Sequence, residues 1–71
     1  MALWKYLDEQ VKITTTTGNI FTGLADIYHY PEDNENGIAS LTVELVDGTL
    51  IGFDENEIAH IEIFNLAEAT G

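Results

Sequence analysis

The chain is 71 residues long, lacks cysteine, and carries 13 carboxylates against two lysines, a formal net charge of −11. Its length predicts one small domain, and its composition excludes disulfides, thiol catalysis and a membrane-spanning segment and fits a cytoplasmic protein. Nucleic acids are held largely by cations that displace counterions from phosphates, so nucleic acid is an unfavourable partner and a basic protein a favourable one, although the acids could serve solubility alone.

The first segment, residues 2–10, predicts a short amphipathic helix. Its apolar residues Leu3, Trp4 and Leu7, continued by Val11, have the spacing of one helical stripe. Such a helix would cover one end of the domain. Trp4 could instead offer a docking site to a partner.

From Val11 the apolar spacing changes from helical to alternating, which indicates β-strands. A β-branched run ends at a two-residue turn on Gly18 and Asn19, which both tolerate positive φ, and a long second strand follows over residues 20–30. Gly23 lies inside that strand. An internal glycine usually marks a sharp bend or a bulge, so we expect the sheet to curl there.

A polar loop over residues 31–37 follows the second strand, and its acids and amides invite a calcium-binding interpretation. With Glu32 as the first ligand, two asparagines and a glycine fall where an EF-hand loop needs them. The position of the required bidentate glutamate is Val43, however, within a segment that predicts strand. The loop therefore predicts no EF-hand, and we expect no metal site.

Alternation continues beyond the loop. Residues 39–46 predict a third strand with one buried face, Asp47 and Gly48 supply a hairpin turn, and residues 50–53 predict a short fourth strand.

A tight acidic turn over residues 54–57, long enough for one turn of 3₁₀ helix, precedes the last strand. That strand is predicted over residues 59–66, with Ile61 and Ile63 pointing inward. Residues 67–71 are expected to fray.

Five short strands behind a helix predict a mostly β fold, a small five-stranded SH3-like or OB-like barrel over residues 11–66 of a single domain spanning residues 1–71. Its motifs resemble those of the Sm/LSm family. Val11-Lys12-Ile13 running to Gly18 and Gly23 is similar to the first Sm motif, and residues 54–61 are similar to the second. The resemblance implies an Sm-like barrel that forms a ring by pairing the fourth strand of one subunit with the fifth strand of the next.

The positions with which that family contacts RNA carry different residues in this chain. His29 and Asp33 stand where the first motif has an aspartate and an asparagine. Asp54-Glu55 stands in place of the Arg-Gly pair of the second motif. The resemblance therefore implies the scaffold and the ring without the RNA contacts.

Apolar residues on the expected outer faces, Ile20 and Leu24 among them, independently predict self-association, since exposed apolar patches often mark interfaces. We expect a homo-oligomer of about five to seven subunits, as the resemblance also implies. The residues expected at its interface, on the fourth and fifth strands, are Leu50, Ile51, Phe53, Ile61, Ile63 and Phe64.

No arrangement of residues predicts catalysis or a bound cofactor. Ser40 is the only serine and has no nucleophile turn around it, and neither His29 nor His60 has a second ligand at metal spacing. We therefore expect a non-enzymatic binding or regulatory module whose acidic surface meets a basic protein. The expected contact residues are Glu32, Asp33, Glu35, Asp54, Glu55 and Glu57.

The alternative hypothesis is an RNA-binding Sm-like protein that uses aromatic stacking. Each stacked base contributes ~1–3 kcal/mol, which could compensate for the missing cations. In that hypothesis the contact residues are Tyr28, Tyr30, Phe21 and Trp4.

Overall fold

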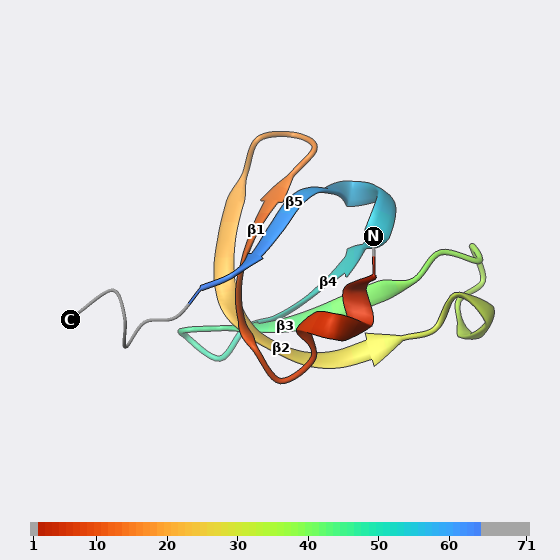
Figure 1. Cartoon of the computed structure of the whole chain (residues 1–71), viewed down its shortest axis with the longest axis horizontal. Coiled ribbons are helices and arrows are strands. Elements are labelled where there is room, and N and C mark those ends of the chain that lie inside the picture. Colours follow the sequence, from red (N-terminus) through yellow and green to blue (C-terminus); the bar gives the residue numbers. More distant parts are fainter. Residues whose placement is uncertain (1, 65–71) are drawn as a thin grey trace.

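The computed structural model describes residues 2–64, and these residues form one antiparallel sheet of five strands with three short 3₁₀ helices. The prediction of a mostly β fold is confirmed. Figure 1 shows the strands curling around a common interior, with the first helix at one end. The elements are η1 (Leu3–Tyr6), β1 (Gln10–Thr15), β2 (Ile20–His29), η2 (Pro31–Asp33), β3 (Ser40–Leu45), β4 (Leu50–Asp54), η3 (Glu55–Glu57) and β5 (Ile58–Ile63).

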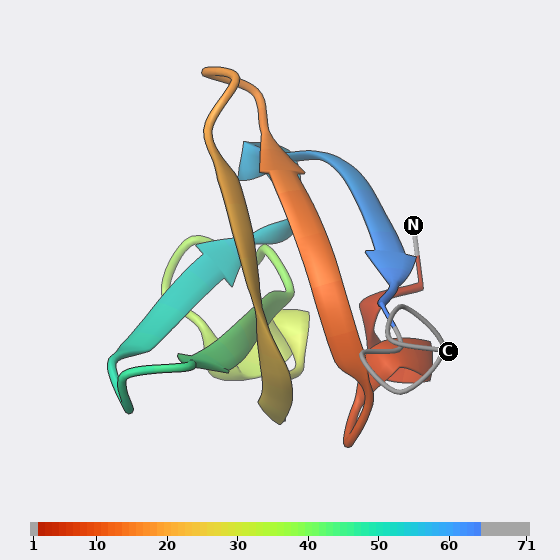
Figure 2. The same ribbon diagram turned by 90° about the vertical axis from the view of Figure 1, so that its left-hand side faces the viewer.

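The strands lie in the order β4-β3-β2-β1-β5, and the sheet does not close into the predicted barrel. Closure would need a ladder between β4 and β5, and residues 2–64 form none. The three residues of η3 make a corner rather than a hairpin turn, so β4 and β5 run on opposite sides of the β1–β2 hairpin (Figure 2). Both are therefore edge strands of an open, strongly curled sheet.

The bulge in β2 lies beyond the predicted position. The β2–β3 ladder shifts register between Ala25 and Ile27, not at Gly23. Gly23 is instead a point of close approach between the strands. A Cβ there would collide with the carbonyl oxygen of Glu44 and lie 2.8 Å from Cγ1 of Val43. Only a residue without a side chain lets β2 and β3 come so near at this point.

The N-terminal segment forms one 3₁₀ turn where the sequence predicts a helix over residues 2–10. Asp8 adopts a φ of 68°, and its N–H donates to the Ala25 carbonyl at 2.8 Å. Glu9 accepts a hydrogen bond from the Ala25 N–H at 2.9 Å. These contacts with β2 end the helix early, because backbone groups bonded to a strand cannot also continue a helical ladder.

The two tight hairpins share one construction. Gly18 and Gly48 have φ values of 90° and 88°, and each donates its N–H to the carbonyl three residues earlier. The Thr15 N–H donates to the Asn19 carbonyl at 2.8 Å, so Asn19 already belongs to the ladder. The two-residue turn predicted on Gly18 and Asn19 is therefore a three-residue loop, a type I turn followed by a left-handed residue.

The core fills the inner face of the curled sheet. Ile61 points inward as predicted, whereas Ile63 is 55% exposed, because it lies at the end of an edge strand. No helix within residues 2–64 is long and apolar enough to cross a membrane. The predicted end of the last strand and the tail lie outside the described residues. The buried core residues are Leu3, Val11, Ile13, Ala25, Leu41, Val43, Phe53, Ile58 and Ile61.

Candidate functional site: an acidic end

The polar loop between β2 and β3 is shaped by its asparagines. Asn34 Nδ2 donates to the Ile38 carbonyl at 2.6 Å and to Ser40 Oγ at 3.4 Å. Asn36 Oδ1 accepts from the Ile38 N–H at 3.0 Å. The loop therefore presents its carboxylates from a bonded backbone. The exposed carboxylates are those of Glu32, Asp33 and Glu35.

The acidic turn forms η3, as the sequence suggests, between the two edge strands. Glu57 Oε1 accepts from the Asp54 N–H at 3.0 Å, which satisfies a donor that the start of a helical turn leaves free. The Glu55 N–H donates to the Ala39 carbonyl at 2.8 Å, and the Thr16 N–H donates to the Glu57 carbonyl at 2.9 Å. The turn is thus tied both to the end of the polar loop and to the β1–β2 hairpin.

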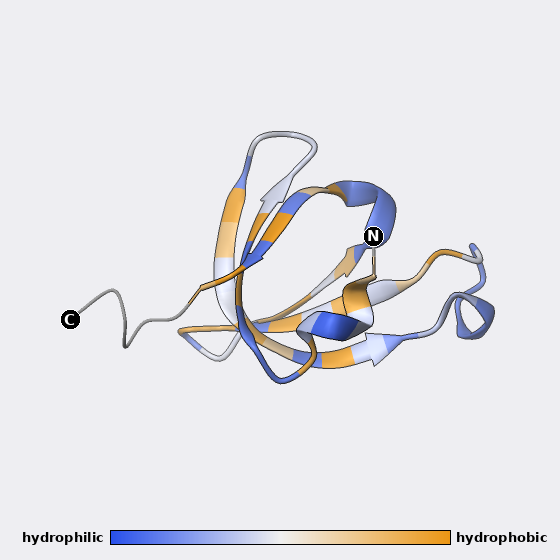
Figure 3. Cartoon of the chain, viewed as in Figure 1, coloured by the Kyte–Doolittle hydropathy of each residue, from blue (hydrophilic) through white to orange (hydrophobic). Residues whose placement is uncertain are grey.

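One side-chain hydrogen bond joins these two acidic segments. Asn36 Nδ2 donates to Asp54 Oδ2 at 3.2 Å, across 18 positions of sequence. Figure 3 shows the loop and η3 as hydrophilic segments of the same end of the molecule. All six carboxylates predicted to contact a partner therefore come from one region. We call it the acidic end, and it consists of Glu32, Asp33, Glu35, Asp54, Glu55 and Glu57.

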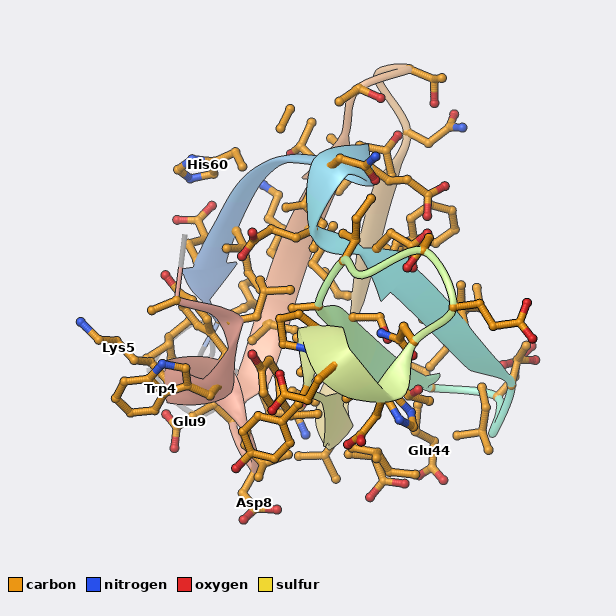
Figure 4. The ribbon with its side chains drawn as sticks, turned by 90° about the vertical axis from the view of Figure 1, so that its right-hand side faces the viewer. Trp4, Lys5, Asp8, Glu9, Glu44 and His60 are labelled. Carbon is orange, nitrogen blue, oxygen red and sulfur yellow. The ribbon has the colours of Figure 1, made fainter. Side chains whose placement is uncertain are left out.

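Neither segment of the acidic end contains a cation, since the two lysines belong to η1 and β1. Lys5 projects together with Trp4 to one side of the polar loop (Figure 4), and its Nζ lies 5.9 Å from the indole ring centroid. Lys12 lies between Thr22 and Glu62 in the sheet. A group of carboxylates with no cations among them creates a negative electrostatic potential, which complements a cationic surface.

The histidines and the serine do not form a reactive group. His29 and Ser40 face each other in the β2–β3 ladder, but the His29 Nε2 lies 3.5 Å from Thr42 Oγ1 and Ser40 Oγ bonds to Asn34. His60 projects outward from β5 (Figure 4). Among residues 2–64, no three histidine, aspartate or glutamate side chains come together as a metal-binding group.

The four aromatic residues of the RNA hypothesis have different environments. Trp4 is 59% exposed on η1, and Tyr30 is 56% exposed after β2. Tyr28 packs edge-on against Tyr30, with ring centroids 5.0 Å apart, and is itself half-buried. Phe21 packs against Phe53 of the core at 5.3 Å. Trp4 and Tyr30 are therefore the rings most available to a base.

The residues predicted for the oligomer interface divide into exposed and buried sets. Leu50 of β4 is 56% exposed and Ile63 of β5 is 55% exposed. Phe53 and Ile61 lie in the protein's own core, so their side chains are not available to a neighbouring subunit. Ile51 and Phe64 are half-buried.

Both edge strands also carry outward-facing backbone groups. Hydrogen-bonded and non-bonded pairs alternate along an antiparallel ladder. The Glu55 N–H donates to the Ala39 carbonyl, and the Phe64 N–H donates to the Gln10 carbonyl at 2.7 Å. These two bonds show which residues of β4 and β5 form hydrogen-bonded pairs with the neighbouring strand and which do not. The peptide groups turned away from the sheet belong to Leu50 and Gly52 on β4 and to Ile61 and Ile63 on β5.

A second surface feature was not predicted from the sequence. A shallow groove of about 360 Å³ lies between the start of β2 and the β3–β4 turn. Its sequence signals were weak: an apolar residue on an expected outer face, Ile20, and an apolar residue beside a turn, Val46. The lining residues are Ile20, Phe21, Thr22, Leu45, Val46 and Asp47.

Asp47 is the charged residue of this groove. Its carboxylate accepts the Thr49 N–H at 3.0 Å, and this hydrogen bond lowers the pKa of Asp47 below its ordinary value of 3.8. The group therefore stays ionised at neutral pH and gives the groove a negative lip.

No family model, curated protein or solved structure matches the chain.

Proposed function

We propose that the protein is a non-enzymatic, Sm-like binding module that assembles through its sheet edges and holds a basic protein partner on its acidic end. The observation that carries this proposal is the Asn36–Asp54 hydrogen bond, which joins the two acidic segments. Carboxylates on a bonded backbone lose less conformational freedom on binding than those of a flexible acidic tail. A surface of this kind suits a cationic patch spread over several residues.

The balance of charge favours a protein partner over nucleic acid. The chain offers two lysines for phosphate contacts and a net charge of −11 that repels a polyanion. The same charge steers a basic protein toward the molecule and gives the complex a strong dependence on salt.

A nona-arginine peptide with a fluorescent label is a suitable probe, with binding followed by anisotropy from 50 to 300 mM salt. One variant neutralises the acidic end with Glu32→Gln, Asp33→Asn, Glu35→Gln and Glu55→Gln, and leaves Asp54 and Glu57 to hold the turn. A control variant removes equal charge elsewhere, with Asp8→Asn, Glu9→Gln, Asp26→Asn and Glu62→Gln, all at exposed positions.

If the acidic end is the site, the first variant should weaken binding about tenfold or more and the control by about threefold at most, because distant charges are screened within ~10 Å. Equal losses in the two variants would contradict the proposal. Binding would then follow net charge alone, in agreement with acids that serve solubility.

Assembly through the edges is the second part of the proposal. β4 and β5 contain neither proline nor lysine, the residues with which exposed edges are commonly protected. Outward peptide groups and the exposed side chains of Leu50 and Ile63 make each edge suitable for a strand from another copy. Pairing β4 of one subunit with β5 of the next would place one acidic end at each junction, because η3 connects the two strands.

RNA binding by aromatic stacking is the second candidate, and the exposure of Trp4 and Tyr30 favours it. The test is retention of single-stranded oligo-U and oligo-A at 50 mM salt, where phosphate contacts are strongest. We expect no retention. Micromolar binding that is lost in Trp4→Ala or Tyr30→Ala would replace the protein-partner proposal.

A further inference from the structure

The groove between β2 and the β3–β4 turn has a different character from the acidic end. Figure 2 looks onto this side of the molecule, with β2 in the centre and the β3–β4 turn at the lower left. Two of its apolar residues are unusually open to solvent, since Ile20 is 58% and Val46 is 91% exposed. The groove's volume of about 360 Å³ falls in the range of ~300–1,000 Å³ typical of ligand sites.

The groove also contains an unpaired stretch of strand. β2 pairs with β1 from Ile20 onward, but its ladder with β3 begins only at Gly23. Within residues 2–64, no strand lies beside residues 20–22 on the groove side. The side that faces the groove is therefore a short free edge inside the sheet.

The register shows which backbone groups this free edge offers. Thr15 and Asn19 form a hydrogen-bonded pair, so by alternation the peptide groups of Phe21 also turn toward β1. The N–H and C=O of Ile20 and the N–H of Thr22 then turn toward the groove. An extended chain laid along residues 20–22 would find both a donor and an acceptor there.

The charges around the groove specify the kind of chain that fits. Asp47 lines the groove, and Glu44 of β3 lies near it, facing outward beside Leu24 and Leu50. Neither lysine of the protein lies on β2, β3 or the β3–β4 turn. The groove therefore complements cations, and a second copy of this acidic chain is disfavoured as its occupant.

We propose that this groove binds an extended segment of another protein in which apolar residues alternate with lysine or arginine. The segment adds as a short strand beside residues 20–22. Successive side chains of a strand point to opposite faces. One set packs on Ile20 and Val46 while the other reaches Asp47. Main-chain hydrogen bonds hold the segment, as in other cases of strand addition to a free edge.

The probe is a fluorescein-labelled peptide, acetylated and amidated, with the sequence Lys-Val-Lys-Val-Lys-Val-Lys. Two further peptides carry N-methyl groups on all valines or on all inner lysines. Only one of the two sets of amides faces β2 when the peptide binds as a strand, because peptide groups alternate in direction. We expect one methylated peptide to lose about tenfold or more in affinity and the other to keep its affinity within about threefold.

Two protein variants test the side-chain contacts. Ile20→Thr keeps a β-branched residue in the strand and removes apolar contact, and Ile27→Thr is the matched control, an exposed isoleucine of the same strand beyond its bulge. The first should weaken the probe about fivefold or more and the second less than about twofold. In nuclear magnetic resonance spectra, the amides of Ile20 and Thr22 should shift and exchange more slowly with the probe bound.

Three results would overturn the inference. The first is equal loss of affinity in the two N-methylated peptides, which would show attraction by charge without strand addition. The second is equal loss in Ile20→Thr and Ile27→Thr. The third is a change in the protein's molar mass in Ile20→Thr, which would show that a second copy of the chain occupies the groove. The groove and the acidic end share no residue, so neutralising the acidic end should weaken the probe by about threefold at most, and this variant tests the two proposals separately.

Discussion

Replacing Gly23 with alanine tests the close approach of β2 and β3. The new Cβ would collide with the Glu44 carbonyl oxygen and stand 2.8 Å from Val43 Cγ1. The first contact is with backbone, so it cannot be relieved by rotating a side chain, and the two strands must separate. Overpacking of this kind costs ~1–3 kcal/mol, and the stiffer unfolded chain returns only ~0.4–1 kcal/mol. We expect a net destabilisation of about 1–2 kcal/mol.

For a domain of this size, 1 kcal/mol corresponds to ~4–8 °C in Tm, so Gly23→Ala should melt about 4–16 °C below the parent. Gly52→Ala is the matched control. It also lies within a strand, but the nearest atom to its new Cβ is Thr42 Oγ1 at 4.0 Å, so no clash offsets the stiffer unfolded chain and the variant should melt at or slightly above the parent. Circular dichroism at two protein concentrations separates folding from assembly. A difference of less than about 2 °C between the two variants would refute the reasoning.

Light scattering should give a molar mass about five to seven times 7.9 kDa, more readily near 0.3 M salt, where charge repulsion is screened. Leu50→Glu should shift the protein toward monomer, and Val46→Glu should not. A monomeric parent in 0.3 M salt would refute the ring. Asn36→Ala should lower the unfolding free energy by about 1 kcal/mol and weaken nona-arginine binding without changing charge, and unchanged binding would show that the hydrogen bond to the acidic turn is dispensable. The Thr49 N–H donates to Asp47 and lowers the pKa of its carboxyl in the folded protein. The stability that this group contributes is therefore fully present above the ordinary pKa of 3.8 and is lost as pH falls through the lowered pKa. The advantage of the parent over Asp47→Ala in urea should therefore be constant at neutral pH and shrink below pH 3.8, and an advantage that grows there would refute the assignment.

The strands followed from the sequence because their signals are local. Alternating apolar residues from Val11 to Ile61 mark a sheet with one buried face, and the glycines at Gly18 and Gly48 occupy the left-handed positions that their loops require. The edges of the sheet depend on contacts between distant segments, and there the sequence was a weaker guide. Alternation put Ile63 in the core, although its side chain is more than half exposed at the end of β5.

The acidic end shows the same division. Each of its two segments was visible as a run of carboxylates, since charge and turn residues are read along the chain. The two segments lie together because Asn36 donates a hydrogen bond to Asp54, and the spacing of residues along the chain does not reveal that contact. The groove was harder still to foresee. It exists because β3 leaves β2 at Gly23, and the place where two strands separate is decided by the whole sheet.

The two edges of the sheet are different surfaces, and this has a consequence for growth. A contact between unlike edges is head-to-tail, so each added copy leaves one β4 edge and one β5 edge still open at the ends of the assembly. The rotation that relates one copy to the next decides whether growth stops in a closed ring or continues as a filament. The net charge of −11 opposes every addition at neutral pH and vanishes near the isoelectric point of about 4.1. If copies join by these edges, the carboxylates oppose growth at neutral pH, and acid removes this opposition.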